Sequence, residues 1–165
     1  MKIALIIVLV CLCSAIGFGF SNGYKQRKNF FDAYVLFLQS LKTDINFSAD
    51  KLNEIVKRAI QATSCKDFSN LLANYSNSLT ARTELSKDAL FKDVKLLTSQ
   101  EKEQIFRFFS GLGKTDVFNQ VEIISNELER GKSAFQKVKS DCEKYCPLFA
   151  KLGILTGLFL ALIII

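Results

Sequence analysis

The chain has 165 residues, 49% of them hydrophobic, and a net charge of +6, which suits one domain with attached segments. It contains no histidine, so Ser-His-Asp and Cys-His catalytic pairs, histidine-ligated zinc or haem, and imidazole acid–base chemistry are excluded. The sequence identifies no chemical reaction, and a protein that is not an enzyme and uses no cofactor is expected.

The N-terminal segment, residues 1–24, is predicted to be a transmembrane helix. Its apolar run, residues 3–20, holds 15 apolar residues in 18, and a helix of that length spans about 27 Å, close to the thickness of a hydrocarbon core. A secretory signal peptide is the alternative, but the run is longer than a usual signal core and a basic segment, residues 25–28, follows it. Acylation at Cys11 or Cys13 is disfavoured because bulky residues precede both.

Residues 25–147 are predicted to form a helical cytoplasmic domain. This segment holds 20 of the 22 Lys and Arg residues, all but Lys2 and Lys151, and all 16 Asp and Glu residues, which gives a net charge of +4 without a basic block. No continuous basic face for nucleic acid is visible. Apolar residues recur at helical spacing, without strand-like alternation of useful length. The expected fold class is all-α: a bundle of roughly six helices flanked by two transmembrane helices.

Four helices are expected in the first part of this domain. The first ends at residues 46–48, where Ser48 can cap the second. The third is expected over residues 66–82 and the fourth over residues 84–97. Their predicted inward-facing residues are Phe30, Tyr34, Phe37, Leu41 and Ile45; then Leu52, Ile55, Val56, Ala59 and Ile60; then Phe68, Leu71, Leu72, Tyr75 and Leu79; and finally Leu85, Ala89, Leu90, Val94 and Leu97.

A capping box formed by Thr98 and Glu101 predicts the start of the next helix. That helix should end at residues 111–113, where a glycine can adopt the left-handed conformation. Thr115 or Asp116 can then cap the last helix of the domain.

The last helix has apolar residues at alternating spacings of four and three, the heptad pattern of packed helices. They are Val117, Val121, Ile124, Leu128, Gly131, Phe135, Val138, Cys142 and Tyr145. A helix of about 30 residues, or 45 Å, needs a partner along its length. The first helix of the domain is expected beside it in antiparallel orientation.

The C-terminal segment, residues 148–165, is predicted to be a second transmembrane helix. It holds 14 apolar residues in 18 and one charge, Lys151, whose long side chain can reach the interface. A hydrophobic helix packed in a soluble core is the alternative. Gly153 and Gly157 form a small-xxx-small pair that lets helix backbones approach closely in lipid. Facing candidates in the N-terminal segment are Gly17, Gly19 and Gly23.

Flanking cations predict the orientation. Residues 25–40 and 132–147 together carry seven Lys and Arg, whereas the far side of the two apolar runs carries only Lys2. This asymmetry places the domain in the cytoplasm and both termini outside, in a two-pass integral membrane protein. The five cysteines, two of them in the first apolar run, do not form a disulfide framework.

Two further candidate sites have structural explanations. Cys142 and Cys146 can share one helix face, but two thiols do not complete a four-ligand zinc site, and we interpret them as small core residues. Cys65 stands alone near the start of a helix. The segment Gly111-Leu112-Gly113-Lys114-Thr115 lacks the glycine spacing and the preceding strand of a phosphate-binding loop, so a corner between two helices is expected.

Three stretches match a known family: LQSLKTDINF at residues 38–47, FSGLGKTD at residues 109–116 with Gln120 after it, and LGILTGL at residues 152–158, which follows Tyr145. With the two apolar ends, they make the chain resemble the stage III sporulation protein AB family of endospore-forming bacteria. None of these stretches is catalytic, and residues 60–97 match by position and helical pattern only.

The resemblance implies a membrane subunit of the complex that links mother cell and forespore, with a soluble domain similar to the cytoplasmic domains of the type II secretion platform protein. It implies docking of a secretion-type ATPase of the same operon in the mother-cell cytoplasm, and contacts with other membrane subunits or with further copies of the chain. A purely structural intramembrane assembly subunit and an exported helical domain tethered by its C-terminus are the alternatives. The candidate protein-interaction residues are Gly111, Leu112, Gly113, Asp116 and Gln120, and the candidate membrane-packing residues are Gly153 and Gly157.

Overall fold

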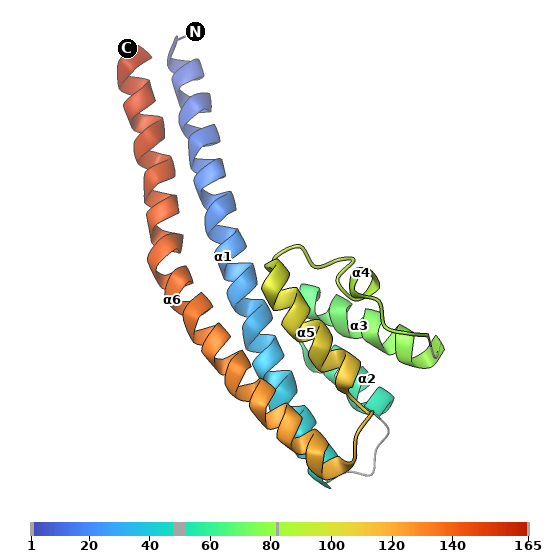
Figure 1. Cartoon of the computed structure of the whole chain (residues 1–165). Helices are drawn as coiled ribbons and strands as arrows, with labels where there is room; N and C mark the ends of the chain where they lie inside the picture. Colours follow the sequence, from blue (N-terminus) through green and yellow to red (C-terminus); the bar gives the residue numbers. More distant parts are fainter. Residues whose placement is uncertain (1, 48–51, 82, 165) are drawn as a thin grey trace. The chain divides into compact units, whose positions relative to one another are not determined.

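The computed structural model describes residues 2–47, 52–81 and 83–164, with side chains except those of residues 2–7, 9, 46, 47, 163 and 164. These residues form six helices joined by turns and irregular segments, which confirms the predicted all-α fold class (Figure 1). In chain order the helices are α1 (Lys2–Phe47), α2 (Leu52–Ala62), α3 (Lys66–Ala81), α4 (Lys87–Leu90), α5 (Ser99–Gly111) and α6 (Val117–Ile164).

The chain divides into two compact units. We call residues 1–28 with residues 136–165 the terminal unit, and residues 29–135 the central unit. Both α1 and α6 contribute to each unit, because each is one continuous helix across the division. The predicted domain limits after residues 24 and 147 therefore fall inside helices, and the three-part domain organisation stays a prediction.

The two long helices continue through residues that often end a helix. A glycine inside a helix costs about 1 kcal/mol relative to alanine, which is too little to interrupt the 46 residues of α1. Pro147 lies inside α6, which continues to Ile164. Because proline has no N–H group, α6 loses one backbone hydrogen bond at this position.

The ring of Phe68 in α3 lies at the centre of the core of the central unit. It contacts the rings of Phe30, Tyr34 and Phe37 in α1 at centroid distances of 5.5, 6.0 and 5.7 Å. Phe37 in turn stacks on Phe109 of α5 at 6.0 Å. All five rings are buried, so aromatic packing, in which offset and edge-to-face pairs are favourable, joins α1, α3 and α5.

Within the central unit α6 runs antiparallel to α1, which confirms the predicted pairing (Figure 1). A Cβ atom on Gly131 would lie 3.3 Å from Leu38 and 3.5 Å from Val35, so the missing side chain lets the two helices approach. Ile124 is fully buried, whereas Val117 is 60% exposed. The heptad stripe therefore does not enter the core at the first residue of α6.

The second and third predicted helices are confirmed as α2 and α3. Ile55 and Val56 of α2 are buried as predicted, and so are Leu71 and Leu72 of α3. The predicted cap at Ser48 lies outside the described residues.

The predicted helix over residues 84–97 is wrong, because α4 comprises only Lys87–Leu90. The side-chain amide of Asn74 donates to the carbonyl of Leu90 at 3.3 Å and to Asp93 Oδ2 at 3.5 Å. Asn74 of α3 thus occupies the carbonyl of Leu90, which would accept a backbone hydrogen bond if α4 continued for another turn. Leu90 and Val94 are nevertheless fully buried, whereas Ala89, also predicted to face inward, is exposed. The apolar spacing therefore predicted burial in part and the helix incorrectly.

The predicted capping box starts α5. The N–H of Glu101 donates to Thr98 Oγ1 at 3.3 Å, and the N–H of Thr98 donates to Glu101 Oε2 at 2.8 Å. Each residue therefore satisfies an amide that would otherwise have no partner at the helix end.

We expect Thr98→Ala to lower the free energy of unfolding by about 1 kcal/mol, the usual value of a lost N-terminal cap. Thermal and denaturant unfolding of the full chain in detergent micelles, followed by circular dichroism, measures this change. Thr83→Ala is the matched control: Thr83 is exposed and its side chain has no hydrogen bond within the described part of the chain, so its effect should stay within about 0.5 kcal/mol. Equal effects of the two substitutions would contradict the capping role.

Candidate functional site

The predicted protein-interaction residues lie in the corner between α5 and α6, residues 111–120. Gly113 has a φ of +79°, in the left-handed region that glycine adopts without strain. The N–H of Lys114 donates to the carbonyl of Gly111 at 3.4 Å, and the side chain of Leu112 is buried. The segment is a tight turn between two helices, as expected, and its shape depends on one glycine.

Of the two predicted caps, Asp116 is the one that caps α6. Its Oδ2 atom accepts a hydrogen bond from the N–H of Asn119 at 3.4 Å, and its Oδ1 atom accepts one from the Asn119 side-chain amide. These hydrogen bonds lower the pKa of the Asp116 carboxyl. An ionised carboxylate here also interacts favourably with the helix N-terminus.

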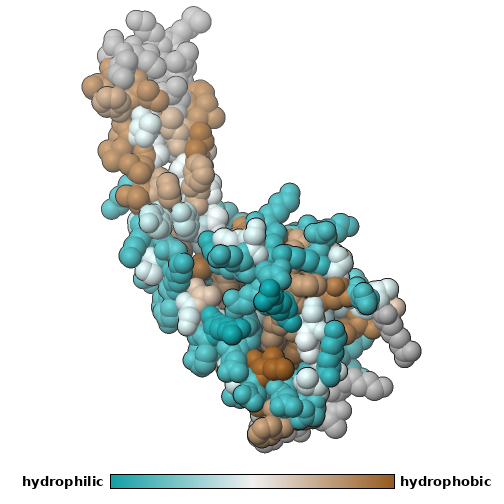
Figure 2. All heavy atoms as spheres, in the orientation of Figure 1, coloured by the Kyte–Doolittle hydropathy of each residue, from teal (hydrophilic) through white to brown (hydrophobic). Residues whose placement is uncertain are grey.

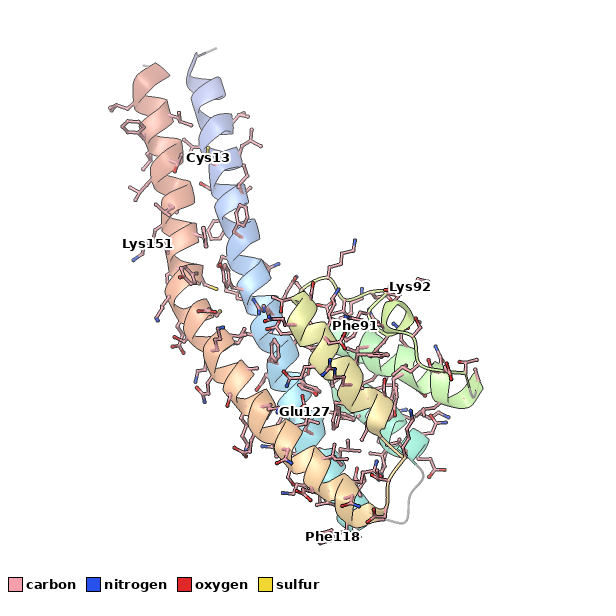
Figure 3. The ribbon with its side chains drawn as sticks, in the orientation of Figure 1. Cys13, Phe91, Lys92, Phe118, Glu127 and Lys151 are labelled. Atoms are coloured by element: carbon pink, nitrogen blue, oxygen red, sulfur yellow. The ribbon has the colours of Figure 1, made fainter. Side chains whose placement is uncertain are left out.

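The first two residues of α6 place apolar side chains in solvent. Val117 is 60% exposed, and Phe118, labelled in Figure 3 at the start of α6, is 80% exposed. Among the predicted residues, Leu112 and Gln120 are buried, whereas a Cβ atom on Gly111 would meet nothing within 4 Å. The corner thus turns an apolar pair outward. Phe118 was not among the predicted interaction residues. Its position outside the heptad stripe could have indicated that this apolar side chain faces outward.

A buried carboxylate, Glu127 of α6, joins three helices of the central unit (Figure 3). The Tyr34 hydroxyl of α1 donates to its Oε1 atom at 2.9 Å, and the Gln104 amide of α5 donates to the same atom at 3.0 Å. Arg130 Nη1 lies 3.9 Å from Oε2. Burial raises the pKa of the Glu127 carboxyl, more than these partners lower it. Burial and the nearby Glu127 carboxylate both raise the pKa of Tyr34.

A groove of about 740 Å³ lies beside this cluster, between α5 and α6. The Lys87 ammonium contacts Glu103 Oε2 at 2.8 Å, and Arg107 Nε contacts Glu103 Oε1 at 3.1 Å. Hydrogen bonds from these two cations lower the pKa of the Glu103 carboxyl. The described charges at the edge of the groove therefore largely neutralise one another.

In the terminal unit, glycines bring the backbones of α1 and α6 together. A Cβ atom on Gly17 would lie 2.6 Å from the carbonyl oxygen of Phe149, and one on Gly153 would lie 2.8 Å from that of Cys13. A Cβ on Gly157 would lie 3.0 Å from a backbone atom of α1. At the present helix separation Gly17 and Gly153 exclude any side chain, and at Gly157 a side chain would require its neighbours to shift slightly. The three positions bring together the two predicted packing residues and one glycine of α1.

The other two glycines of α1 do not take part in this contact. A Cβ atom on Gly19 or Gly23 would meet nothing within 4 Å. The sequence therefore predicted the segment that packs against α6 but not the residue. The rotation of α1 about its axis decides that Gly17, and neither Gly19 nor Gly23, faces α6.

Four rings form a cluster between α1 and α6 in the terminal unit. Tyr24 stacks on Tyr145 at 5.5 Å and on Phe149 at 5.9 Å, and Phe20 lies 5.7 Å from Phe149. Tyr side chains, with an apolar ring and a polar hydroxyl, are typical of the membrane–water interface.

Cys142 and Cys146 are buried on one face of α6, with their sulfur atoms 3.0 Å apart. The Cys146 thiol donates to the carbonyl of Ser21 at 3.4 Å. Burial, and then the hydrogen bond with Cys146, raises the pKa of the Cys142 thiol. A buried protonated thiol behaves as a small apolar side chain. Within the part of the chain that the structure describes, no group of three or more Cys, Asp or Glu residues could hold a metal ion.

One helix among the described residues, α6, is long and apolar enough to cross a membrane. It contains an 18-residue stretch with a mean hydropathy of 1.7, of which only 17% is buried. Figure 2 shows hydrophobic residues gathered on the terminal unit, whereas the visible face of the central unit is mostly hydrophilic. A core helix of a soluble protein would be mostly buried.

These features define a class: an all-helical protein with a polar helical unit and an apolar, largely uncovered pair of terminal helices. The sequence profile of the stage III sporulation protein AB family matches residues 2–165, so the chain belongs to this family and has a role in sporulation. No curated protein and no solved structure matches the chain.

Glu127 should make stability depend on pH. Since its folded pKa is raised, the folded state keeps this proton after the unfolded chain has lost it. The free energy of unfolding should therefore fall as pH rises from the unfolded pKa through the folded pKa, and then level off. Glu127→Gln keeps an Oε1 acceptor for Tyr34 and Gln104 and should remove this fall. Chemical unfolding of the wild type and of this variant from pH 4 to 8 measures the difference.

Glu127→Leu is the contrasting variant, because it removes the acceptor of two buried donors. We expect it to cost about 1–3 kcal/mol at every pH. A wild-type stability that rises with pH relative to Glu127→Gln would contradict the raised pKa.

Gly153→Leu should force α1 and α6 apart in the terminal unit and lower the free energy of unfolding by about 1–3 kcal/mol, as overpacking usually does. Gly19→Leu is the matched control in the same unit, where open space leaves only the gain in helix propensity, up to about 1 kcal/mol. Thermal unfolding of the full chain in micelles compares the two. If Gly153→Leu is as stable as Gly19→Leu, the close contact does not exist.

Proposed function

We propose that this chain is a non-enzymatic, two-pass membrane subunit of the complex that links mother cell and forespore, and that its central unit docks a secretion-type ATPase of the same operon. Membership of the stage III sporulation protein AB family supports the place in this complex. The docking role rests on one observation: the outward-facing pair Val117 and Phe118 at the α5–α6 corner. Aromatic side chains of this kind are frequent anchors of protein interfaces.

The central unit suits a docking role because its core is tightly connected. Buried rings join α1, α3 and α5, and the Glu127 cluster adds α6. A partner that binds the corner would therefore meet a surface whose parts are fixed to one another. The helix that starts at this corner, α6, continues without a break to Ile164. In our proposal the ATPase performs the chemistry, and this helix receives the load.

The proposed topology has two membrane helices, with the central unit in the cytoplasm. The long apolar stretch of α6 supports a C-terminal span, and the ring cluster at Tyr24 and Tyr145 suits an interface. The seven Lys and Arg on the inner flanks, against Lys2 outside, support the orientation. An exported central unit would run against this charge distribution.

A second candidate function is a purely structural assembly subunit whose contacts lie in the membrane. Apolar side chains of α6 that stay exposed in the terminal unit, such as Leu155 and Phe159, favour it, because they are uncovered in this chain and suited to packing in the membrane. Replacing the exposed Leu155 and Phe159 by Ala, outside the glycine contact between α1 and α6, separates the two functions. Loss of complex assembly with ATPase binding intact would favour the structural role, and intact assembly would exclude it.

We expect the purified full chain to bind the ATPase at micromolar concentration, and Phe118→Asp to weaken binding about tenfold or more. Burying a phenylalanine contributes about 1.5–3 kcal/mol, and about 1.4 kcal/mol corresponds to tenfold in Kd. Asn77→Asp, at an exposed position of α3, adds the same charge as a control and should leave Kd unchanged. Pull-down and fluorescence titration measure both variants.

The absence of wild-type binding at micromolar concentration would contradict the docking role. Binding that Phe118→Asp leaves unchanged would exclude the corner as the docking surface.

A further inference from the structure

A second concave surface lies between α1 and α2 of the central unit, as a groove of about 540 Å³. Its floor consists of buried apolar side chains, among them Phe37, Leu41 and Ile55. One wall carries the small side chains of Ala59 and Ala62 from α2. The surface is therefore both apolar at its base and open enough to admit another chain.

The length of the groove fits a helix. Residues of α1 line it from Asn29 to Asp44, which corresponds to about 22 Å at 1.5 Å per residue. Leu36, at its edge, is 57% exposed. The groove thus combines this length with an apolar floor, an alanine wall and an exposed leucine at its edge. Such grooves bind one face of an amphipathic helix.

Charge at the edge indicates the chemistry of that helix. Asp44 lies 3.7 Å from Arg58, whereas the exposed Asp32 forms no ion pair within the described part of the chain. A lysine or arginine beside the apolar face of an incoming helix would complement Asp32. The acidic edge thus favours a basic amphipathic helix over an acidic one.

The groove and the α5–α6 corner both adjoin α2. Leu52, the first residue of α2, lies 3.5 Å from the position of a Cβ on Gly113, and Ile55, one turn later, lines the groove. We propose that the groove holds a basic amphipathic helix of the same ATPase that docks at the corner. This inference rests on the proposed docking function and adds the surface and the chemistry of the bound segment.

Cys65 provides a probe at the site, because it lines the groove and is half-buried. Trypsin releases it in the peptide 59–66, which contains no other cysteine. The full chain in lipid nanodiscs is treated with a maleimide, with and without purified ATPase, and the modified fraction of this peptide is followed by mass spectrometry. We expect the ATPase to slow modification at least fivefold.

Asp32→Lys is the second arm, and Glu84→Lys, an equal charge change at an exposed loop position, is its control. We expect Asp32→Lys to weaken ATPase binding at least fivefold and Glu84→Lys to leave it unchanged. Both results are required. If the ATPase binds the wild-type chain but fails to protect Cys65, or if Asp32→Lys binds normally, the groove inference is overturned while docking stands.

Two further outcomes are equally decisive. No ATPase binding at all overturns docking and the groove inference together. Protection of Cys65 that rises with the concentration of this chain alone assigns the groove to a second copy and overturns the assignment to the ATPase.

Discussion

The antiparallel packing of α1 and α6 is the constraint on which both compact units depend. In the terminal unit it requires residues without side chains, since a Cβ on Gly17 or Gly153 would fall within 3 Å of a facing carbonyl oxygen. In the central unit Gly131 permits the approach, and the hydrogen bond from Tyr34 to Glu127 fixes the pair by a polar contact. The α1–α6 pairing therefore depends on close glycine packing in the terminal unit, and on a buried hydrogen bond together with Gly131 in the central unit.

The hydrogen bonds of Glu127 constrain the arrangement of three helices in the central unit. A buried carboxylate is costly unless it is hydrogen-bonded, and Glu127 obtains its two donors from different helices, α1 and α5. Moving any of these helices would leave a buried donor or acceptor unpaired. The cluster thus favours one arrangement of the central unit, which suits the docking role that we propose.

Much of this architecture could be predicted from the sequence because it depends on local chemistry. Apolar spacing located α2, α3 and α5, and Thr98 with Glu101 fixed the start of α5. Features that depend on tertiary contacts could not be predicted. Asn74 ends α4 from another helix, and the rotation of α1 decides that Gly17 rather than Gly19 meets α6. The α1–α2 groove likewise exists only once two helices lie side by side.

In the proposed topology two membrane helices hold the central unit in the cytoplasm, and the reactivity of Cys65 distinguishes this topology from an exported central unit. Intact cells that contain the full chain are treated with a membrane-impermeant maleimide before or after permeabilisation, with a denatured sample as the control for thiol reactivity. The tryptic peptide 59–66 then reports modification of Cys65 alone. We expect modification only after permeabilisation, whereas modification in intact cells would show that the central unit lies outside the cytoplasm.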